Sequence, residues 1–550
     1  MVVHFRKFSR ARGLRGTLLA LGAMLAVSAQ ADATAPSASD IEAGRRIYQE
    51  GILPSGEPLK GQRADSGEVS GDQAACAKCH RRSGMGSLEG QIAIPPVSAP
   101  FLYLDEQPKA LVNPRSPRSL TQNHKPYTRQ SLGEALRTGK NSEGADMHAM
   151  MPRYELSEAD LKVLDAYLRQ LSVDLSPGVG QDSIKFAAVI TPGVDPKLSE
   201  AVRRMLAVSV MQRNSYQKNV PGRMRMGAAL IPRQERNWEL KIWELQGAPD
   251  SWGQQLAEFY RKEPVFALVS GLSASGWEPV HAYCQKESIP CLLPSLLTPP
   301  PQEEFYPLYY SRGVALEAEV LAKHLREAGK QAPKRLVQVF IGGEAEKAAA
   351  QVLTHALEGS GITVVERPLN GSDPKALSTA LKDVGSRDAV MFWLRPAELA
   401  VLKKAAPKLA GTAYLSGQLA EEQFDSIPPA WKARARLVYP YELGENRTKN
   451  LLRLSGWLKA IKVPAVNEPV QAEVLFSMIF LTDITSMMLD NYYRDYMVER
   501  AEDMLSWNPN STAYPHLSMA PGRRFASKGA YIARFEKDGK LVGDGGWIVP

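Results

Sequence analysis

The sequence predicts a multidomain chain in which a helical N-terminal unit precedes a larger α/β unit built on doubly wound parallel sheets. At 550 residues the chain is too long for a single hydrophobic core. Up to about residue 171 the apolar residues recur at helical spacing, whereas beyond residue 184 short apolar runs alternate with amphipathic helical stretches. Residues 173–183, which lie between the two patterns, contain Ser, Pro and Gly and are typical of a linker.

The first 31 residues have the composition of a secretory signal peptide. Five basic residues precede an apolar stretch from Thr17 to Val27, and Ala29-Gln30-Ala31 gives a small-x-small cleavage pattern. The apolar stretch is about eleven residues long, which is short for a membrane span. We therefore expect export to the periplasm and no transmembrane segment in the mature chain.

The net charge gives no indication of a nucleic-acid partner. The whole chain carries +8, and the leader contributes five basic and no acidic residues, so the remainder is near +3. This charge is modest for a chain of this size, and we expect no nucleic acid to bind.

The chemically most informative stretch is Cys76-Ala77-Lys78-Cys79-His80. Two thiols separated by two residues and followed at once by an imidazole form the attachment motif of a c-type haem. The cysteines add to the two vinyl groups of the porphyrin, and the histidine faces the iron. A redox dithiol, half of a zinc site or a structural disulfide are the alternatives, but no second Cys pair or His pair lies nearby. Because the motif occurs once, we expect one covalent haem.

Residues 40–172, which surround this motif, resemble a class I cytochrome c. The resemblance rests on the helical segment Ile41–Tyr48 with its Gly44, on Pro95-Pro96, and on Met151-Pro152 before a capped helix that starts at Ser157. It implies an all-α domain in which the Pro95 carbonyl takes the second N–H of His80. It also implies that the last helix crosses the first one at Gly44.

The resemblance implies that Met151 supplies the sixth iron ligand, because Pro152 follows directly and holds Met151 extended. Met150 and His148 are the main rivals. Further rival ligands are Met85, His124 and Met147.

In the α/β unit, strands and helices alternate from residue 184 to the C-terminus. The expected strands are 186–190, 238–245, 265–269, 289–293, 306–310, 336–341, 362–365, 389–394, 412–415 and 437–439. Two such series indicate two lobes with parallel sheets.

Residues 184–550 resemble the type I periplasmic binding proteins of the branched-chain amino acid and amide class. The resemblance rests on the opening segment Ile184–Pro192, on Tyr309–Gly313 and on Pro521–Gly529. It implies a small-molecule ligand between the lobes. The implied contacts are Ser273, Ser275, Thr298, Arg395 and Gln418. The cationic Arg395 departs from the amino-acid binders and leaves an acidic or a neutral ligand open.

Cys284 and Cys291 remain after the haem motif is assigned. They lie seven residues apart in a chain expected to be exported, where disulfides persist, and we expect a local disulfide. Two buried free thiols are the alternative.

These features favour a periplasmic electron carrier that exchanges single electrons with a dehydrogenase or an oxidase, while the second domain docks the carrier or senses a ligand. Periplasmic alcohol oxidation is one suggested link. The alternative is a solute receptor of an uptake or signalling system in which the haem is a redox sensor. A peroxidase would need an open sixth position on the iron, so we expect a carrier and binding protein rather than an enzyme.

Overall fold

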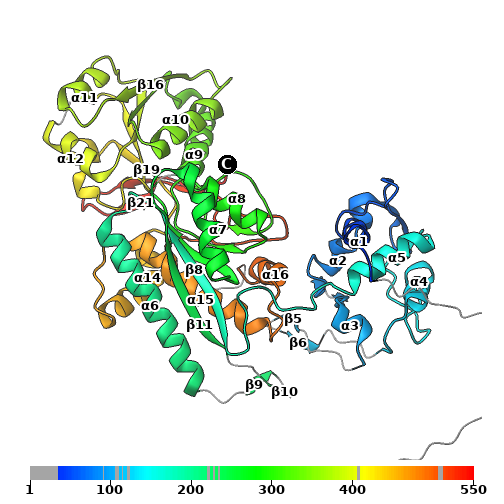
Figure 1. Ribbon diagram of the computed structural model, residues 1–550. Coiled ribbons are helices and arrows are strands. Elements are labelled where there is room, and N and C mark those ends of the chain that lie inside the picture. Colours follow the sequence, from blue (N-terminus) through cyan, green and yellow to red (C-terminus); the bar gives the residue numbers. More distant parts are fainter. Residues whose placement is uncertain are drawn as a thin grey trace, which may run out of the picture.

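The computed structural model describes residues 35–90, 92–105, 111–113, 116–119, 124–219, 223–226, 229–232, 236–274, 276–405, 409–505 and 512–550. It shows a helical N-terminal unit beside a larger two-lobed unit (Figure 1). The predicted signal peptide lies outside the described residues.

The N-terminal unit is a group of helices with small antiparallel additions. Its helices are α1 (Ala38–Glu50), α2 (Ala77–His80), α3 (Ala99–Tyr103), α4 (Arg129–Thr138) and α5 (Glu158–Leu168). Its strands are β1 (Lys60–Arg63), β2 (Gly67–Ser70), β3 (Ser87–Glu89), β4 (Ile92–Ile94), β5 (Leu111–Asn113), β6 (Ser116–Ser119) and β7 (Arg153–Tyr154). The expectation of an all-α domain therefore holds for the packed helices and not for the whole unit.

Helices α1 and α5 cross where the first helix carries a glycine. A Cβ atom on Gly44 would lie 2.1 Å from the Val163 carbonyl oxygen and 2.7 Å from the Tyr167 Cβ. The rings of Tyr48 and Tyr167 pack beside this crossing, with centroids 5.5 Å apart. The expected close approach at Gly44 is confirmed.

Two side-chain caps fix the starts of α4 and α5. Thr128 accepts a hydrogen bond from the backbone N–H of Ser131, and Ser157 accepts one from that of Asp160. The side chains of Ser131 and Asp160 in turn accept hydrogen bonds from the backbone N–H groups of Thr128 and Ser157, so both helices begin with a capping box.

The first lobe is built on a parallel sheet with strand order β11-β8-β12-β13-β14. These strands are β8 (Ser183–Ile190), β11 (Asn237–Glu244), β12 (Ala267–Leu272), β13 (Cys291–Leu292) and β14 (Pro307–Leu308). The helices are α6 (Pro196–Asn219), α7 (Trp252–Lys262) and α8 (Glu278–Lys286), and the hairpin β9 (Arg223–Met226) and β10 (Ala229–Pro232) follows α6. Every strand-to-strand pairing in this sheet is parallel, as the sequence predicted.

The second lobe has strand order β16-β15-β17-β18-β19-β20-β21. Its strands are β15 (Arg335–Ile341), β16 (Thr363–Leu369), β17 (Asp388–Trp393), β18 (Thr412–Ser416), β19 (Ala435–Tyr439), β20 (Tyr531–Phe535) and β21 (Leu541–Gly543). Its helices are α9 (Val314–Glu327), α10 (Glu344–Ala356), α11 (Pro374–Leu381), α12 (Pro396–Ala405) and α13 (Pro429–Lys432). The first five strands in this order pair in parallel, and β20 and β21 add antiparallel edges.

After β19 the chain returns to the first lobe through α14 (Gly444–Ala460), α15 (Glu468–Met487) and α16 (Arg494–Leu505). Of the helices described, α15 is the one long and apolar enough to span a membrane, but 67% of its most apolar stretch is buried inside the protein. It packs against α6 and β12 and serves as a core helix of the first lobe.

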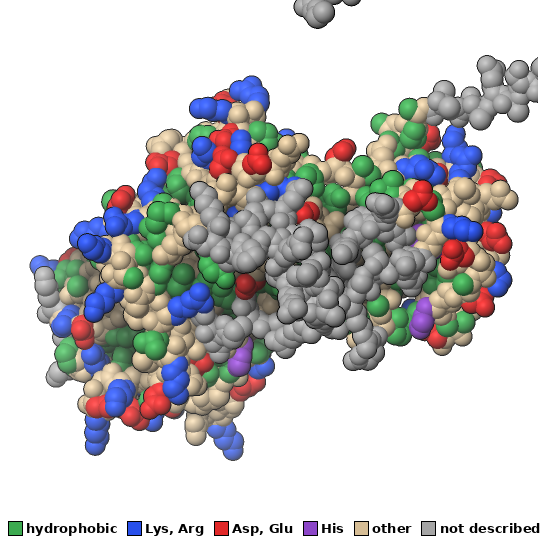
Figure 2. All heavy atoms as spheres, turned by 90° about the horizontal axis from the view of Figure 1, so that it is seen from below, with side chains coloured by type: hydrophobic (Ala, Val, Ile, Leu, Met, Phe, Trp, Pro, Cys, Tyr) green, Lys and Arg blue, Asp and Glu red, His purple; other side chains and the backbone are tan. Residues whose placement is uncertain are grey.

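The segment predicted as a linker is fixed to the two-lobed unit. The Ser176 N–H donates to the Tyr492 carbonyl at 3.1 Å, and the Arg494 N–H donates to the Ser176 hydroxyl at 3.0 Å. A Cβ atom on Gly178 would lie 2.2 Å from the Phe266 nitrogen, so the backbones approach closely here. Basic and acidic side chains are interspersed on the face shown in Figure 2, in keeping with the modest net charge.

We expect Gly44→Ala to lower the stability of the N-terminal unit by about 2–3 kcal/mol, because the added methyl group meets the backbone of α5. Gly456→Ala is the matched control, since an added Cβ at this exposed position in α14 meets nothing within 4 Å. The control should be neutral or stabilising. Calorimetric unfolding of both variants tests the crossing, and equal effects would contradict it.

Candidate functional site

The cysteine–histidine motif forms the short helix α2 and its N-terminal cap, at the edge of an apolar slot in the N-terminal unit. Cys76 caps α2, and the backbone N–H of His80 donates to the Cys76 carbonyl at 2.9 Å. This single turn places Cys76, Cys79 and His80 around one cavity. The two thiols are not joined to each other.

The imidazole of His80 is held by a backbone carbonyl. Its Nδ1 lies 2.8 Å from the Pro95 carbonyl oxygen, and the residue is only 6% exposed. Gly86 has a positive φ of 80°, and a Cβ atom there would lie 2.3 Å from the Ile94 carbonyl oxygen. The glycine therefore lets the backbone at Ile94 and Pro95 approach the motif. With Nδ1 used in this way, Nε2 is the nitrogen left to bind a metal.

The thiols do not resemble an activated redox pair. Burial raises the pKa of the Cys76 thiol to about 12 and that of the Cys79 thiol to about 11. A redox-active dithiol needs a lowered thiol pKa instead. Among the described residues, no group of three or more His, Cys, Asp and Glu side chains is placed to hold a metal ion, which leaves a zinc site without ligands.

Two connected cavities make up the slot. Both are lined by Cys76, His80, Pro95, Tyr127, Met147 and Met151. One cavity continues between the helices, where its walls are Tyr48, Val97, Phe101, Leu102, Leu132, Ala135, Leu136, Leu164 and Leu168. A flat, largely apolar group with two thiol attachment points and an imidazole below it fits these residues, and haem is such a group.

The candidates for the sixth ligand are not placed alike. Met147 and Met151 line both cavities and pack against the core of the N-terminal unit. Met150 lines one cavity, and the exposed His148 accepts a hydrogen bond from the Met150 N–H. Met85, an earlier rival, is buried in the core shared with the two-lobed unit. The structure therefore leaves Met151 as the candidate expected from the sequence and makes Met147 its strongest rival.

Residues 64–172 match the cytochrome c family. They form a cytochrome c domain. Helix α1 precedes the matched residues but packs against α5, so it belongs to the same folded unit. No curated protein matches the chain in sequence.

Solved structures resemble the two-lobed unit. A branched-chain amino acid ABC transporter protein from Thermus thermophilus with bound valine superposes with a TM-score of 0.51 at 10% identity, covering 68% of this chain and 98% of its own. A fatty acid ABC transporter substrate-binding protein from Thermomonospora curvata gives a TM-score of 0.48 at 16% identity, covering 69% of this chain and 95% of its own. The first similarity shows that the two-lobed unit has a periplasmic binding protein fold.

A cavity of about 450 Å³ lies between the two lobes (the cleft). Of the residues predicted to contact a ligand, Ser273, Arg395 and Gln418 line the cleft. Thr298 is not among its lining residues, because the cleft wall ends one residue earlier at Leu297. Contact of Thr298 with a ligand therefore stays a prediction, and Ser275 lies outside the described residues.

Several residues of the cleft were not predicted from the sequence. They are Asp195, Glu421, Tyr441, Asn467, Glu473 and Tyr514. Glu473 is buried in α15, and the Tyr514 hydroxyl donates to its carboxyl group at 2.8 Å. Burial raises the pKa of Glu473 to about 7. Of these six residues, only Asn467 had a recognisable signal in the sequence: Asn before Glu-Pro marks the start of a helix, here α15.

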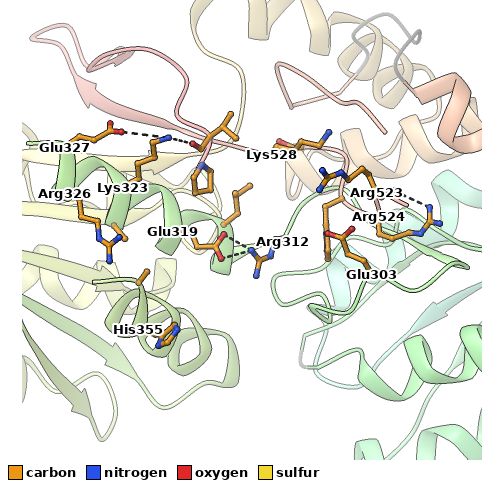
Figure 3. A pocket seen from close by; sticks show the side chains of 17 residues that line it. Glu303, Arg312, Glu319, Lys323, Arg326, Glu327, His355, Arg523, Arg524 and Lys528 are labelled. Carbon is orange, nitrogen blue, oxygen red and sulfur yellow. Dashed lines mark hydrogen bonds and ion pairs between the residues drawn. The ribbon is translucent and has the colours of Figure 1, made fainter. Parts of the chain in front are cut away.

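A second cavity, of about 830 Å³, lies on the outer face between α9, α10 and the C-terminal segment. Figure 3 shows that Arg312 and Glu319 point toward each other across this cavity, while Arg523 and Lys528 lie apart from the α9 side chains. Arg312 pairs with Glu319 at 2.6 Å, and Lys323 donates to the Val549 carbonyl at 2.7 Å. These internal pairs satisfy much of the charge, so the interlobe cleft is the better candidate for a ligand site.

The cytochrome domain is attached to α16 through the residues that follow the cysteine–histidine motif. Glu499 accepts hydrogen bonds from the Ser83 N–H at 2.8 Å and from the Ser83 hydroxyl at 2.5 Å. Both residues are buried, and burial raises the pKa of Glu499 to about 7. The Ser83 carbonyl in turn accepts from the Ser172 hydroxyl at 2.7 Å.

Two arginines extend this contact, which we call the α16 clamp (Arg81, Arg82 and Ser83 on one side, Asp495, Glu499, Glu502 and Asp503 on the other). Arg81 pairs with Glu502 at 3.1 Å, where the side chains are 11% and 2% exposed. Arg82 pairs with Asp495 at 3.0 Å and lies over the ring of Phe305 at 4.8 Å. In Figure 1, α16 lies on the side of the two-lobed unit that faces the cytochrome domain.

The structure joins Cys284, in α8, to Cys291, in β13. Their Cα atoms are 6.3 Å apart, and both residues are buried. The disulfide expected from the sequence is present, and it ties a helix to the strand that follows it.

We expect Met151→Ala to abolish the weak red absorption band that thioether ligation gives in ferric cytochromes, and to lower the reduction potential, because methionine ligation raises it. Visible spectroscopy and redox titration of the haem-loaded protein measure both. Met150→Ala is the matched control and should keep the band. Loss of the band in Met147→Ala, with the band intact in Met151→Ala, would assign the ligand to Met147.

Proposed function

We propose that the protein is a periplasmic electron carrier with one covalent haem, and that its fused binding-protein domain docks the carrier or senses a small molecule. The observation that supports this most directly is the fixed imidazole of His80 beside two thiols at one apolar slot. A covalently held haem supplies reversible one-electron chemistry at its iron.

Each residue of the slot has a role in this proposal. Cys76 and Cys79 hold the group by thioether bonds. His80 would bind the iron through Nε2, because the Pro95 carbonyl accepts a hydrogen bond from Nδ1 and fixes the ring orientation. Met151 would supply a second protein ligand to the iron. Apolar side chains such as Leu132 and Leu164 exclude water and favour outer-sphere electron transfer over chemistry on small molecules.

The α16 clamp supports a combined role for the two domains. It holds the three residues that directly follow His80, and it buries Glu499 and Glu502 against that loop. A flexible tether would not need buried ion pairs, which are costly unless their partners are fixed. The cytochrome domain and the binding-protein domain therefore act as one body, and a periplasmic dehydrogenase or oxidase would meet both.

A solute receptor in which the haem is a redox sensor is the second candidate. The observation that favours it is the buried side-chain nitrogen of Gln418, which lines the cleft and has no hydrogen-bond partner among the described residues. A ligand with an acceptor oxygen in the cleft would satisfy this nitrogen.

Mass spectrometry of the mature protein tests the central assignment. We expect one haem mass on the peptide that contains Cys76 and Cys79, and loss of that mass in a Cys76→Ser, Cys79→Ser variant. Cys284→Ser, Cys291→Ser is the matched control and should keep the haem, because this pair lies in the other domain. An unmodified Cys76–Cys79 peptide from cells that mature c-type cytochromes would refute the assignment.

We expect Arg81→Ala combined with Arg82→Ala to release the cytochrome domain, because about 3 kcal/mol is lost when buried ion pairs lose one partner. Small-angle scattering should then show a larger radius of gyration, and a protease specific for aspartate should cut faster at Asp174 and Asp182. Arg45→Ala with Arg63→Ala is the control, since these arginines pair within the cytochrome domain. Unchanged scattering and cleavage in the clamp variant would show that other contacts fix the domains.

A further inference from the structure

We propose that the cleft takes a small uncharged ligand with a hydroxyl or carbonyl oxygen on an apolar body, and that it discriminates against carboxylates, α-amino acids and amines. This inference rests on the proposed function in one respect, namely that the second domain binds a small molecule. Four features of the cleft support it: occupied backbone donors, a neutralised arginine, an unpaired buried amide and an apolar lining.

Three backbone donors in or beside the cleft, which could bind a ligand carboxylate, are used by the protein itself. The Ala274 N–H donates to the Thr191 hydroxyl at 3.3 Å, and the Gly276 N–H donates to the Glu344 carboxylate at 3.3 Å. At the start of α6, the Asp195 carboxylate accepts from the Leu198 N–H at 2.9 Å. These contacts leave the loop and the helix end with less capacity for an anion.

The one guanidinium group among the described lining residues is already paired. Arg395 donates from Nε to the Glu346 carboxylate at 2.7 Å, and Glu346 is 2% exposed. Three acidic side chains also line the cleft: Asp195, Glu421 and Glu473. Burial raises the pKa of Glu421, and the nearby Asp195 raises it further while Arg395 lowers it. The described lining therefore offers a ligand carboxylate no basic side chain that is not already paired with a protein carboxylate.

Gln418 determines which group the ligand must carry. This glutamine is 6% exposed, and its side-chain nitrogen is buried without a hydrogen-bond partner among the described residues. The backbone N–H of Gln418 is fixed by the carboxylate of the fully buried Glu317 at 3.0 Å, so the side chain projects from a rigid position. An amide NH₂ group only donates, so the ligand must present an acceptor oxygen. A protonated amine has no acceptor and would leave this group unsatisfied.

The opposite wall accepts a hydroxyl or a carbonyl oxygen. Glu473 and Tyr514 share a hydrogen bond at 2.8 Å, and the buried Ser295 hydroxyl lies beside the Glu473 carboxyl without a hydrogen bond of good geometry. Burial raises the pKa of Glu473 to about 7, so this carboxyl can be neutral and can donate as well as accept. Between the walls the lining is apolar, with Leu272, Leu296, Leu297, Val466 and Val470.

A panel of matched probes tests this on the full-length, haem-loaded protein. Isothermal titration calorimetry and thermal shift compare 1-pentanol, 2-pentanone, pentanoate, pentylamine and norvaline, followed by the eight-carbon alcohol, ketone, acid and amine. We expect the alcohol or the ketone of at least one series to bind with a dissociation constant below about 1 mM, and each charged analogue at least tenfold more weakly.

A variant pair tests the role of the amide. Gln418→Met keeps the length of the side chain and removes the donor, and it should weaken binding of the neutral probe about tenfold. Gln351→Met is the matched control, because Gln351 is exposed on α10 outside the cleft. The comparison of ligands on the wild-type protein does not depend on the variants, so it tests the inference even if Gln418→Met does not fold.

Three outcomes would overturn the inference. Tighter binding of pentanoate or octanoate would show that Arg395 recognises an anion, and tighter binding of norvaline or an amine would show that the acidic groups select a cation. Absence of binding by every neutral probe would show that the cleft does not take this class. The haem spectrum and the haem mass are read separately, so failure of the ligand class is distinguishable from failure of the proposed electron carrier.

Discussion

The arrangement of the two domains depends on one buried carboxylate. Glu499 receives both the N–H and the hydroxyl of Ser83, and neither residue is accessible to solvent to any extent that could replace those bonds. A carboxylate in such a place is stabilised only while its donors stay fixed, so the bond demands a fixed position for the loop that follows His80. The ion pairs of Arg81 and Arg82 also restrict the relative orientation of the two domains, because guanidinium groups bind carboxylates in a preferred plane. The cytochrome domain and the two-lobed unit thus meet at one rigid interface, the α16 clamp.

Local sequence signals predicted much of the structure. The cysteine–histidine motif, the capped start at Ser157 and the small residue at Gly44 each act over a few residues or one helix crossing, and each appears in the structure where the sequence indicated. The alternation of strands and helices in the second unit is confirmed for the same reason, since hydrophobic periodicity is a local property. The short strands beside the cytochrome helices were missed because two to four residues carry too little periodicity to recognise.

Contacts between distant segments could not be predicted in this way. Arg395 reads as a free cation in the sequence, but Glu346, 49 residues earlier, neutralises it in the structure. Glu473 lies in a long, largely apolar helix that also contains Glu468 and Asp483, and nothing in this pattern indicates which acidic residue faces a cleft. The acidic residues of α16 read as an ordinary solvated helix face until the cytochrome domain is placed against them. In each case the partner, not the residue, determines the role.

The sequence separation within the α16 clamp has a consequence for biogenesis. Ser83 and Glu499 are 416 residues apart, so their contact closes a loop that includes both lobes. The chain emerges with its N-terminus first, and α16 is among the last helices to become available. The cytochrome domain therefore emerges long before its docking surface on α16 does. The clamp can close only after both lobes have emerged, since Arg81, Arg82 and Ser83 must meet carboxylates that the chain supplies more than 400 residues later.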